Sequence, residues 1–329
     1  MVAIGGGTGL STLLRGLRRH VSAPGQAGTQ DGAISDLAAV VTVTDDGGSS
    51  GRLRQDFNML PPGDLRNCMV ALSEEEDLLT KLFGHRFRGG DSLKGHNVGN
   101  LFVAALTEIT GDFAQAVQLA SKILATRGRI YPATTANTTL VARMDDGSVV
   151  RGETNITASR RRIVELTLDP PGPPPLPETL EAIERASLIT VGPGSLYTSL
   201  ITNLLVDGIP EALAQARGLR VYISNLMTQA NESLGLAASE HIERIYEHTR
   251  APIFDCALVN TAPFSPETLE RYAAEGASPI LADIERIQAL GVRCIAGDFA
   301  SEESVVRHNT NRVTGALLAL GRVAPPARD

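Results

Sequence analysis

The sequence predicts an α/β protein with a doubly wound, mostly parallel Rossmann-like sheet. Short runs of Val, Ile, Ala and Leu recur along the chain, and each is followed by a loop of small or polar residues and then by a helical pattern. This alternation is typical of βαβ units. The core must also be aliphatic, because 43% of the residues are hydrophobic while only 4% are aromatic. An aliphatic core suits parallel strands that are covered by helices on both faces.

The first unit shows the pattern most clearly. Residues 2–4 form a short apolar run, and residues 5–9 form a loop with four glycines. A helix with one apolar stripe is then predicted, since leucines recur with helical spacing at Leu10, Leu13, Leu14 and Leu17. Further strands are predicted at residues 38–44, 187–191, 220–224, 256–259 and 292–296.

Two segments depart from this pattern. Residues 138–156 alternate around Asp145-Asp146-Gly147, and Asp-Gly between alternating runs predicts an antiparallel β-hairpin. Residues 170–177 contain six prolines, which predict a stiff, extended linker between two halves of one domain that spans residues 1–329. A surface loop and a frayed end are predicted at residues 22–33 and 325–329.

Charge and cysteine content exclude several classes of protein. The formal net charge is −7 and no basic stripe is present, so binding to nucleic acid is not expected. The three cysteines are widely spaced, which predicts neither a zinc site nor a disulfide framework and fits a reducing cytoplasm. No signal peptide and no membrane-spanning run is visible. We therefore expect a cytoplasmic protein.

The loop after the first strand is the strongest candidate for a ligand site, because open parallel sheets bind ligands beyond the carboxyl ends of their strands. Its glycines allow close approach of the backbone, and N–H groups at a helix start favour anions. We expect phosphate contacts from Gly5, Gly6, Gly7, Thr8, Gly9 and Ser11. The match to the dinucleotide fingerprint is imperfect, because its third glycine falls on Leu10 or Thr12. A tight turn without a ligand is the alternative.

A second loop of the same kind follows the strand at residues 187–191. We expect it to cradle an anion through Gly192, Gly194, Ser195 and Tyr197. The two loops lie far apart in the sequence but at equivalent strand ends. This combination predicts one ligand that bridges two strands, with a structural turn as the alternative.

Asp45 and Asp46 end the second predicted strand, and Ser49 continues the same polar loop. Carboxylates at this place bind ribose hydroxyls in dinucleotide folds, and they are also suitable ligands for Mg²⁺. The alternative is that Asp-Gly-Gly-Ser-Ser is simply a turn. Mg²⁺ is the one cofactor that these residues suggest, and no residue set predicts any other metal site.

The remaining candidates are single residues. Asn97 and Asn100 precede a helical run and are candidate ligand contacts, with a helix N-cap as the alternative for Asn100. Asn225 follows a strand and is a candidate to bind a base or a sugar. Tyr272 is a candidate to stack on a base, and Arg307 to hold a diphosphate with two hydrogen bonds. No nucleophile motif is present, so the catalytic residues are unknown.

Seven motifs, taken in order, resemble the YvcK-type gluconeogenesis factor family. They lie at residues 4–11, 44–53, 60–67, 95–100, 106–112, 191–198 and 225–229. The resemblance covers roughly residues 2 to 320. That family is related to the CofD enzymes, which transfer a 2-phospholactyl group to a deazaflavin. The resemblance implies a CofD-like fold and the binding of a UDP-sugar such as UDP-N-acetylglucosamine.

The resemblance also implies a role in cell shape and wall synthesis during growth on gluconeogenic carbon, without an established reaction. Our first hypothesis is a regulator without catalytic activity that binds a UDP-sugar. The second is a Mg²⁺-dependent, CofD-like transferase that uses Asp45 or Asp46, and the third is an NAD-binding oxidoreductase. Expected partners are wall-synthesis proteins or a kinase, for which Thr310 is a candidate target, and further copies of this chain.

Overall fold

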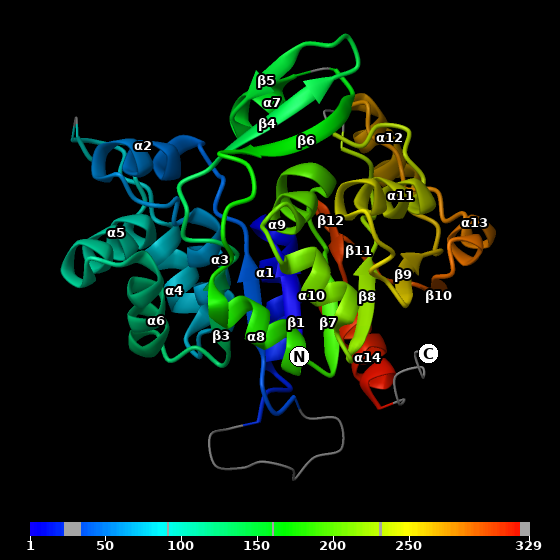
Figure 1. Ribbon diagram of the computed structural model, residues 1–329, viewed down its shortest axis with the longest axis horizontal. Coiled ribbons are helices and arrows are strands. Elements are labelled where there is room, and N and C mark those ends of the chain that lie inside the picture. The colour runs from blue at the N-terminus through cyan, green and yellow to red at the C-terminus, as the bar shows by residue number, and fades with distance from the viewer. Residues whose placement is uncertain (23–33, 91, 160, 230–231, 323–329) are drawn as a thin grey trace.

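The computed structural model describes residues 1–22, 34–90, 92–159, 161–229 and 232–322 (Figure 1). Within them, a seven-stranded sheet has the order β10-β9-β8-β7-β1-β2-β3, and every neighbouring pair is parallel. Its strands are β1 (Val2–Gly5), β2 (Ala38–Val41), β3 (Arg129–Pro132), β7 (Leu188–Val191), β8 (Leu219–Ile223), β9 (Cys256–Asn260) and β10 (Arg293–Gly297). The predicted doubly wound parallel sheet is confirmed.

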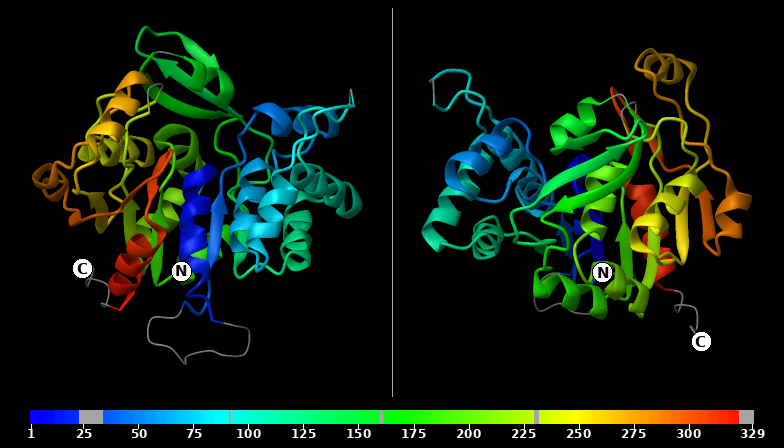
Figure 2. Two further views of the ribbon diagram at one scale, coloured as in Figure 1. Left: turned by 180° about the vertical axis from the view of Figure 1, so that it is seen from behind. Right: turned by 45° about the horizontal axis from the view of Figure 1, so that its top comes forward.

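Helices cover both faces of this sheet, as Figures 1 and 2 show. One core lies between the sheet and the helices α1 (Gly7–Arg18), α3 (Gly63–Leu72), α5 (Val98–Thr110), α6 (Phe113–Ile123) and α14 (Thr310–Gly321). A second core packs the opposite face against α8 (Pro177–Arg185), η1 (Leu196–Ile201), α9 (Thr202–Leu204), α10 (Ile209–Gln215), α11 (Ala238–Thr249) and α13 (Ile284–Ala289). The leucine stripe of α1 is buried as predicted.

The predicted hairpin excursion is present as part of a three-stranded antiparallel sheet of order β5-β4-β6, which lies at the top of Figure 1. Its strands are β4 (Thr139–Met144), β5 (Val149–Arg151) and β6 (Ile163–Asp169). The second strand ends at Arg151 and not at Ile156, because Gly152 turns the chain with a φ of 86°. Residues of the expected strand then form the helix α7 (Glu153–Ala158).

Other departures from the prediction are local. The second strand of the main sheet ends at Val41 and not at residue 44, and neither β3 nor β6 was predicted. The proline-rich residues 170–176 connect β6 to α8 without regular structure, and Pro177 is the first residue of α8. Nearly all of the predicted loop at 22–33, and the end at 325–329, fall outside the described residues. The single-domain organisation stays a prediction.

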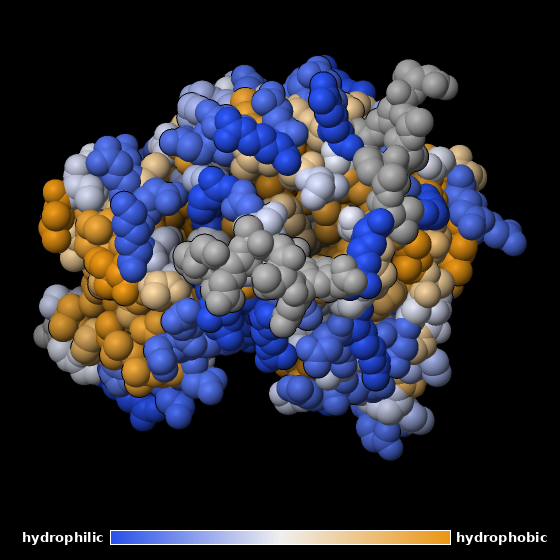
Figure 3. Space-filling view, turned by 90° about the horizontal axis from the view of Figure 1, so that it is seen from below, coloured by the Kyte–Doolittle hydropathy of each residue, from blue (hydrophilic) through white to orange (hydrophobic). Residues whose placement is uncertain are grey.

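The remaining elements lie around the sheet. They are the helices α2 (Gly48–Phe57), α4 (Glu76–Gly84) and α12 (Pro266–Ala274), and a hairpin of β11 (Ala300–Glu302) and β12 (Val306–His308). None of the described helices combines the length and the apolar character that crossing a bilayer requires. Large exposed apolar side chains occur on α4, α5 and α6, namely Leu78, Leu82, Ile109 and Ile123. Apolar residues also gather at the left of Figure 3, the side on which α4, α5 and α6 lie in Figure 1. Self-association stays a prediction.

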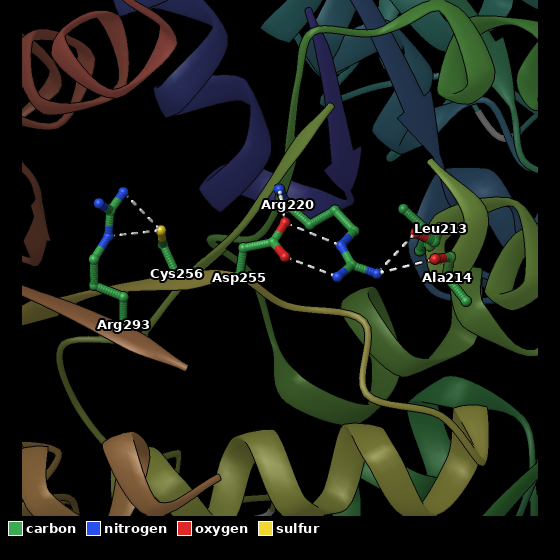
Figure 4. Close-up of polar contacts among 6 residues, drawn as sticks. All are labelled: Leu213, Ala214, Arg220, Asp255, Cys256 and Arg293. Carbon is green, nitrogen blue, oxygen red and sulfur yellow. Dashed lines mark hydrogen bonds and ion pairs between the residues drawn. The ribbon is translucent and has the colours of Figure 1, made fainter. Parts of the chain in front are cut away.

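A buried ion pair joins the amino ends of β8 and β9 (Figure 4). Arg220 donates to both carboxylate oxygens of Asp255, from Nε to Oδ2 at 3.1 Å and from Nη2 to Oδ1 at 2.8 Å. The two side chains are only 10% and 11% exposed. Arg220 also donates through Nη1 to the carbonyl oxygens of Leu213 and Ala214 at the end of α10. One guanidinium thus holds two strands and a helix together. Next to this pair, Arg293 of β10 donates to the Sγ atom of Cys256.

Candidate functional site

The two glycine loops meet at the carboxyl ends of β1 and β7, which are neighbours in the sheet. The chain leaves β1 toward β2 on one side and leaves β7 toward β8 on the other, so this is the switch point of the sheet. A Cβ atom at Gly9 would lie 2.5 Å from the carbonyl oxygen of Pro193. Only glycine therefore allows the two loops to pack as they do.

A cavity of about 300 Å³ opens beside these loops. Its wall combines the strand-end loops with the β11–β12 hairpin, which is far away in the sequence. Of the predicted site residues, it is lined by Gly6, Gly7, Thr8, Gly9, Gly194, Ser195, Asn225, Tyr272 and Arg307. The sequence did not identify the other polar lining residues, which are Thr12, Ser199, Thr228, Gln229 and His308.

Several cavity residues are already held by the protein. Gln229 donates from Nε2 to the Oγ atom of Ser195 at 2.9 Å, which connects the loops that follow β7 and β8. His308 forms a 3.0 Å hydrogen bond from Nε2 to the carbonyl oxygen of Ser224. Burial lowers the pKa of His308 to about 4, so this imidazole is neutral at pH 7 and Nε2 carries the proton. The buried Oδ1 atom of Asn225 has no hydrogen-bond partner among the described residues, and a donor on a ligand would satisfy it.

Four predicted residues near the loops do not line the cavity. Gly5 ends β1, and Gly192 lies beneath the second loop, where a Cβ atom would be 2.8 Å from the carbonyl oxygen of Ile223. Ser11 donates to the carbonyl oxygen of Thr8 within α1. Tyr197 is 1% exposed and its hydroxyl donates to the carbonyl oxygen of Ile163. These four residues are therefore part of the scaffold beneath the loops.

The other predicted residues lie in a polar region at the end of β2 and are not part of the cavity lining. Asp45 accepts from the backbone N–H of Gly47 at 2.9 Å, which is the turn that we considered as the alternative. Asp46 accepts from the backbone N–H and the hydroxyl of Thr154 in α7, at 2.8 and 2.6 Å. Asp46 thus ties α7, which follows β5 of the small antiparallel sheet, to the loop after β2.

Ser49, Asn97 and Asn100 are buried in the same region. Ser49 Oγ lies 3.0 Å from Nδ1 of His96. Asn97 caps α5 by accepting from the backbone N–H of Asn100 at 2.7 Å, so the cap lies three residues before the predicted one, and Asn100 lies within the helix. Ser49 thus links α2 to the segment before α5, Asn97 stabilises the start of α5, and the Asn100 side chain contacts Ser50 of α2.

Three carboxylates that were not among the predicted site residues interact with the two glycine loops or with one another. The backbone N–H of Gly7 donates to the carboxylate of Asp64, in the first turn of α3. Burial raises the pKa of Asp64 to about 6, the Gly7 bond opposes this, and Asp45 adds to it. Glu232 accepts from the hydroxyl of Thr198 at 2.7 Å, and burial raises its pKa. One loop N–H that we expected to bind phosphate is therefore occupied by a carboxylate.

Glu153 of α7 is the third of these carboxylates. Burial, followed by the charges of Asp64 and Asp45, raises its pKa to about 9. Its Oε2 atom accepts from the hydroxyl of Thr44 at 3.3 Å. At pH 7 the Glu153 side chain is therefore a neutral carboxylic acid, held near the carboxylates of Asp64 and Asp45.

Replacing Glu153 with glutamine is expected to raise the stability at pH 8 by at least about 1 kcal/mol. The folded pKa lies above the ordinary value of 4.5, so the unfolded chain releases this proton first and wild-type stability falls as the pH rises between the two values. Glutamine carries no such proton, and the gain should shrink at pH 5. Urea unfolding at both pH values measures this. Glu184→Gln, at an exposed position of α8, is the control, and equal pH dependence of wild type and Glu153→Gln would contradict the assignment.

The described residues offer two neighbouring carboxylates for Mg²⁺ but not a complete set of protein ligands. Among the described residues, no three His, Cys, Asp or Glu side chains are grouped to hold a metal ion. Asp45 accepts a hydrogen bond from Gly47, and Asp46 accepts one from Thr154. A Mg²⁺ ion at this place would take its further ligands from phosphate and water, as Mg²⁺ commonly does.

The fold and the cavity define a Rossmann-like α/β protein with a glycine-lined cavity at the switch point of its sheet. Comparison with known proteins gives the particular family. The chain belongs to the family described as 2-phospho-L-lactate transferase CofD, whose model matches residues 1–300. The CofD relationship that the motifs indicated is thereby confirmed.

Within this family the chain is similar to proteins named gluconeogenesis factors. It is 46% identical over 319 residues to the one from Halalkalibacterium halodurans, covering 97% of this chain and 95% of the relative. The factor from Bacillus subtilis is 44% identical over 317 residues, with 96% of each chain covered. The solved structure of protein BH3568 from Bacillus halodurans matches with a TM-score of 0.90 at 46% identity, covering 96% of this chain and 98% of that one.

Proposed function

We propose that this chain is a cytoplasmic regulator that binds a nucleotide sugar of the UDP-N-acetylglucosamine type in the switch-point cavity. The observation that carries the proposal is the meeting of two glycine loops with Arg307 and Tyr272 around one cavity. The loops offer backbone N–H groups and hydroxyls to a diphosphate, and Arg307 supplies a positive charge. The volume of about 300 Å³ is at the lower end of the range for small-molecule sites.

The carbohydrate and the biological role rest on similarity. The relatives are named gluconeogenesis factors, which supports a role in growth on gluconeogenic carbon. A regulator of wall synthesis and cell shape would respond to a UDP-sugar, since the sugar is a building block of the wall. Wall-synthesis proteins, or a kinase acting on Thr310, are the proposed partners. Thr310 is the first residue of α14, three residues beyond Arg307.

Isothermal titration tests this proposal. UDP-N-acetylglucosamine, UDP, GDP and NAD are each titrated into the protein with and without Mg²⁺, and the mixtures are analysed for products. We expect saturable binding of UDP-N-acetylglucosamine without turnover. Absence of binding, or preference for NAD or GDP, would reject the proposed ligand.

The CofD match and the carboxylates beside the glycine loop favour one second candidate, a CofD-like phospholactyl-type transferase. In this reading Asp45 or Asp46 serves the reaction. Product formation with a nucleotide-activated donor, lost in Asp45→Asn or Asp46→Asn, would support it. Turnover that persists in both variants would remove these residues from the reaction.

A further inference from the structure

The β11–β12 hairpin that carries Arg307 lies between α1 and α12, and in the left view of Figure 2 it rises beside the blue helix α1. It is a two-stranded ribbon in which Arg307 pairs with Ser301 and Val306 pairs with Glu302. Two strands alone are marginally stable in water. The hairpin therefore depends on its neighbours to hold a fixed position over the cavity.

The side chain of Arg307 does not supply that position. It is exposed, and within the described part of the chain it takes part in no hydrogen bond or ion pair. The position of the β12 backbone therefore sets the range that this flexible guanidinium can reach. An arginine that is not held by the protein pays a large entropic cost on binding, so any shift of its backbone changes how well it meets a ligand.

Helix α12 holds the hairpin at three places. Ser265, the residue before α12, donates from its hydroxyl to Glu302 at 2.7 Å, and Arg271 donates to the carbonyl oxygen of Glu303 at 3.2 Å. The third contact is the closest to Arg307. The backbone N–H of Val306 donates to the hydroxyl oxygen of Tyr272 at 2.8 Å.

The Tyr272 contact occupies an edge of β12 that the hairpin itself leaves open. The ring of Tyr272 lines the cavity, while its hydroxyl is bonded to the strand immediately before Arg307. His308, on the other side of Arg307, is fixed through Ser224. The residues before and after Arg307 are therefore each fixed by a hydrogen bond that involves a side chain.

We infer that Tyr272 is a positioning residue for Arg307: its hydroxyl fixes β12 so that the guanidinium reaches the anionic group of the ligand in the cavity. This inference rests on the proposed function for its ligand, a nucleoside diphosphate sugar. It assigns the hydroxyl a role separate from any stacking by the ring. The Ser265–Glu302 contact holds the other strand of the pair, at the β11 residue that lies directly across from Val306.

Tyr272→Phe tests the inference, because it keeps the ring and removes the hydroxyl. Loss of one hydrogen bond should weaken UDP-N-acetylglucosamine binding about 3- to 10-fold. The same change in an Arg307→Ala background should have less than about a twofold effect, because the hydroxyl then has no arginine to position. The dependence of binding on salt should also be reduced in Tyr272→Phe, since the arginine–phosphate contact is the salt-sensitive one.

A readout without ligand separates this inference from the proposed function. In the free protein, hydrogen exchange of residues 300–308 should be faster in Tyr272→Phe than in wild type, while the melting temperature changes little. Ser265→Ala should also speed this exchange, because it removes a contact to Glu302, the β11 residue that pairs with Val306. If wild type does not bind the nucleotide sugar, the proposed function fails even where the exchange result holds.

Two outcomes would overturn the inference. Wild-type affinity and wild-type exchange in Tyr272→Phe would show that the hydroxyl holds nothing. An equal loss of affinity with and without Arg307 would show that the hydroxyl contacts the ligand directly and does not act through the arginine.

Discussion

Asp255→Ala is expected to lower the free energy of unfolding by about 3–5 kcal/mol. The change leaves the guanidinium of Arg220 buried without its carboxylate, and it also removes the acceptor of the Arg220 backbone N–H at 2.8 Å. Removing one partner of a buried pair costs more than the pair contributes, because the remaining charge is poorly solvated. Urea unfolding of the variant and the wild type measures the loss.

Two further variants sharpen this test. The double variant Arg220→Met/Asp255→Leu removes both charges and should recover most of the stability lost in Asp255→Ala. Glu165→Ala breaks the ion pair with Arg143, whose partners are 53% and 50% exposed, and should cost about 1 kcal/mol or less. A loss of that small size in Asp255→Ala would mean that the Arg220–Asp255 pair does not hold the strands.

Arg307→Ala is expected to weaken binding of UDP-N-acetylglucosamine by about 1.5–3 kcal/mol, a factor of roughly 10 to 150 in Kd. Arg307 is the cavity residue that carries a fixed positive charge, and a charge-assisted bond to a diphosphate is worth this amount. Titration calorimetry measures the change. Arg185→Ala is the matched control, because Arg185 ends α8, away from the cavity, with a side chain that is 79% exposed.

Unchanged affinity for UDP-N-acetylglucosamine in Arg307→Ala would remove this residue from the site. Arg307→Lys should keep part of the affinity, since lysine retains the charge but lacks the planar pair of donors.

The main sheet could be predicted because its signals are local. Each strand is a short apolar run, and each ends at small or polar residues, so the loops at Gly5–Gly9 and Gly192–Ser195 were visible in the sequence. Their meeting followed from a general rule about parallel sheets. β3 was not predicted, since Arg129–Pro132 is short and ends in proline, a residue that is rare inside strands.

The rest of the site depends on contacts between distant parts of the chain. Asp64, Glu153 and Glu232 come near one another from three different elements or loops, and no spacing in the sequence marks them as a group. Tyr197 follows the second loop directly, but the π-helical turn η1 directs its ring into the core. Tyr272 and Arg307 reach the cavity only because α12 and the hairpin pack together.

A crystal structure of the protein with UDP-N-acetylglucosamine tests the central claim most directly. The account predicts that the ligand fills the switch-point cavity, with its diphosphate against the two glycine loops and the guanidinium of Arg307 on a phosphate oxygen. A ligand bound elsewhere, for example beside Asp45 and Glu153, or a cavity that stays empty at saturating ligand, would contradict it.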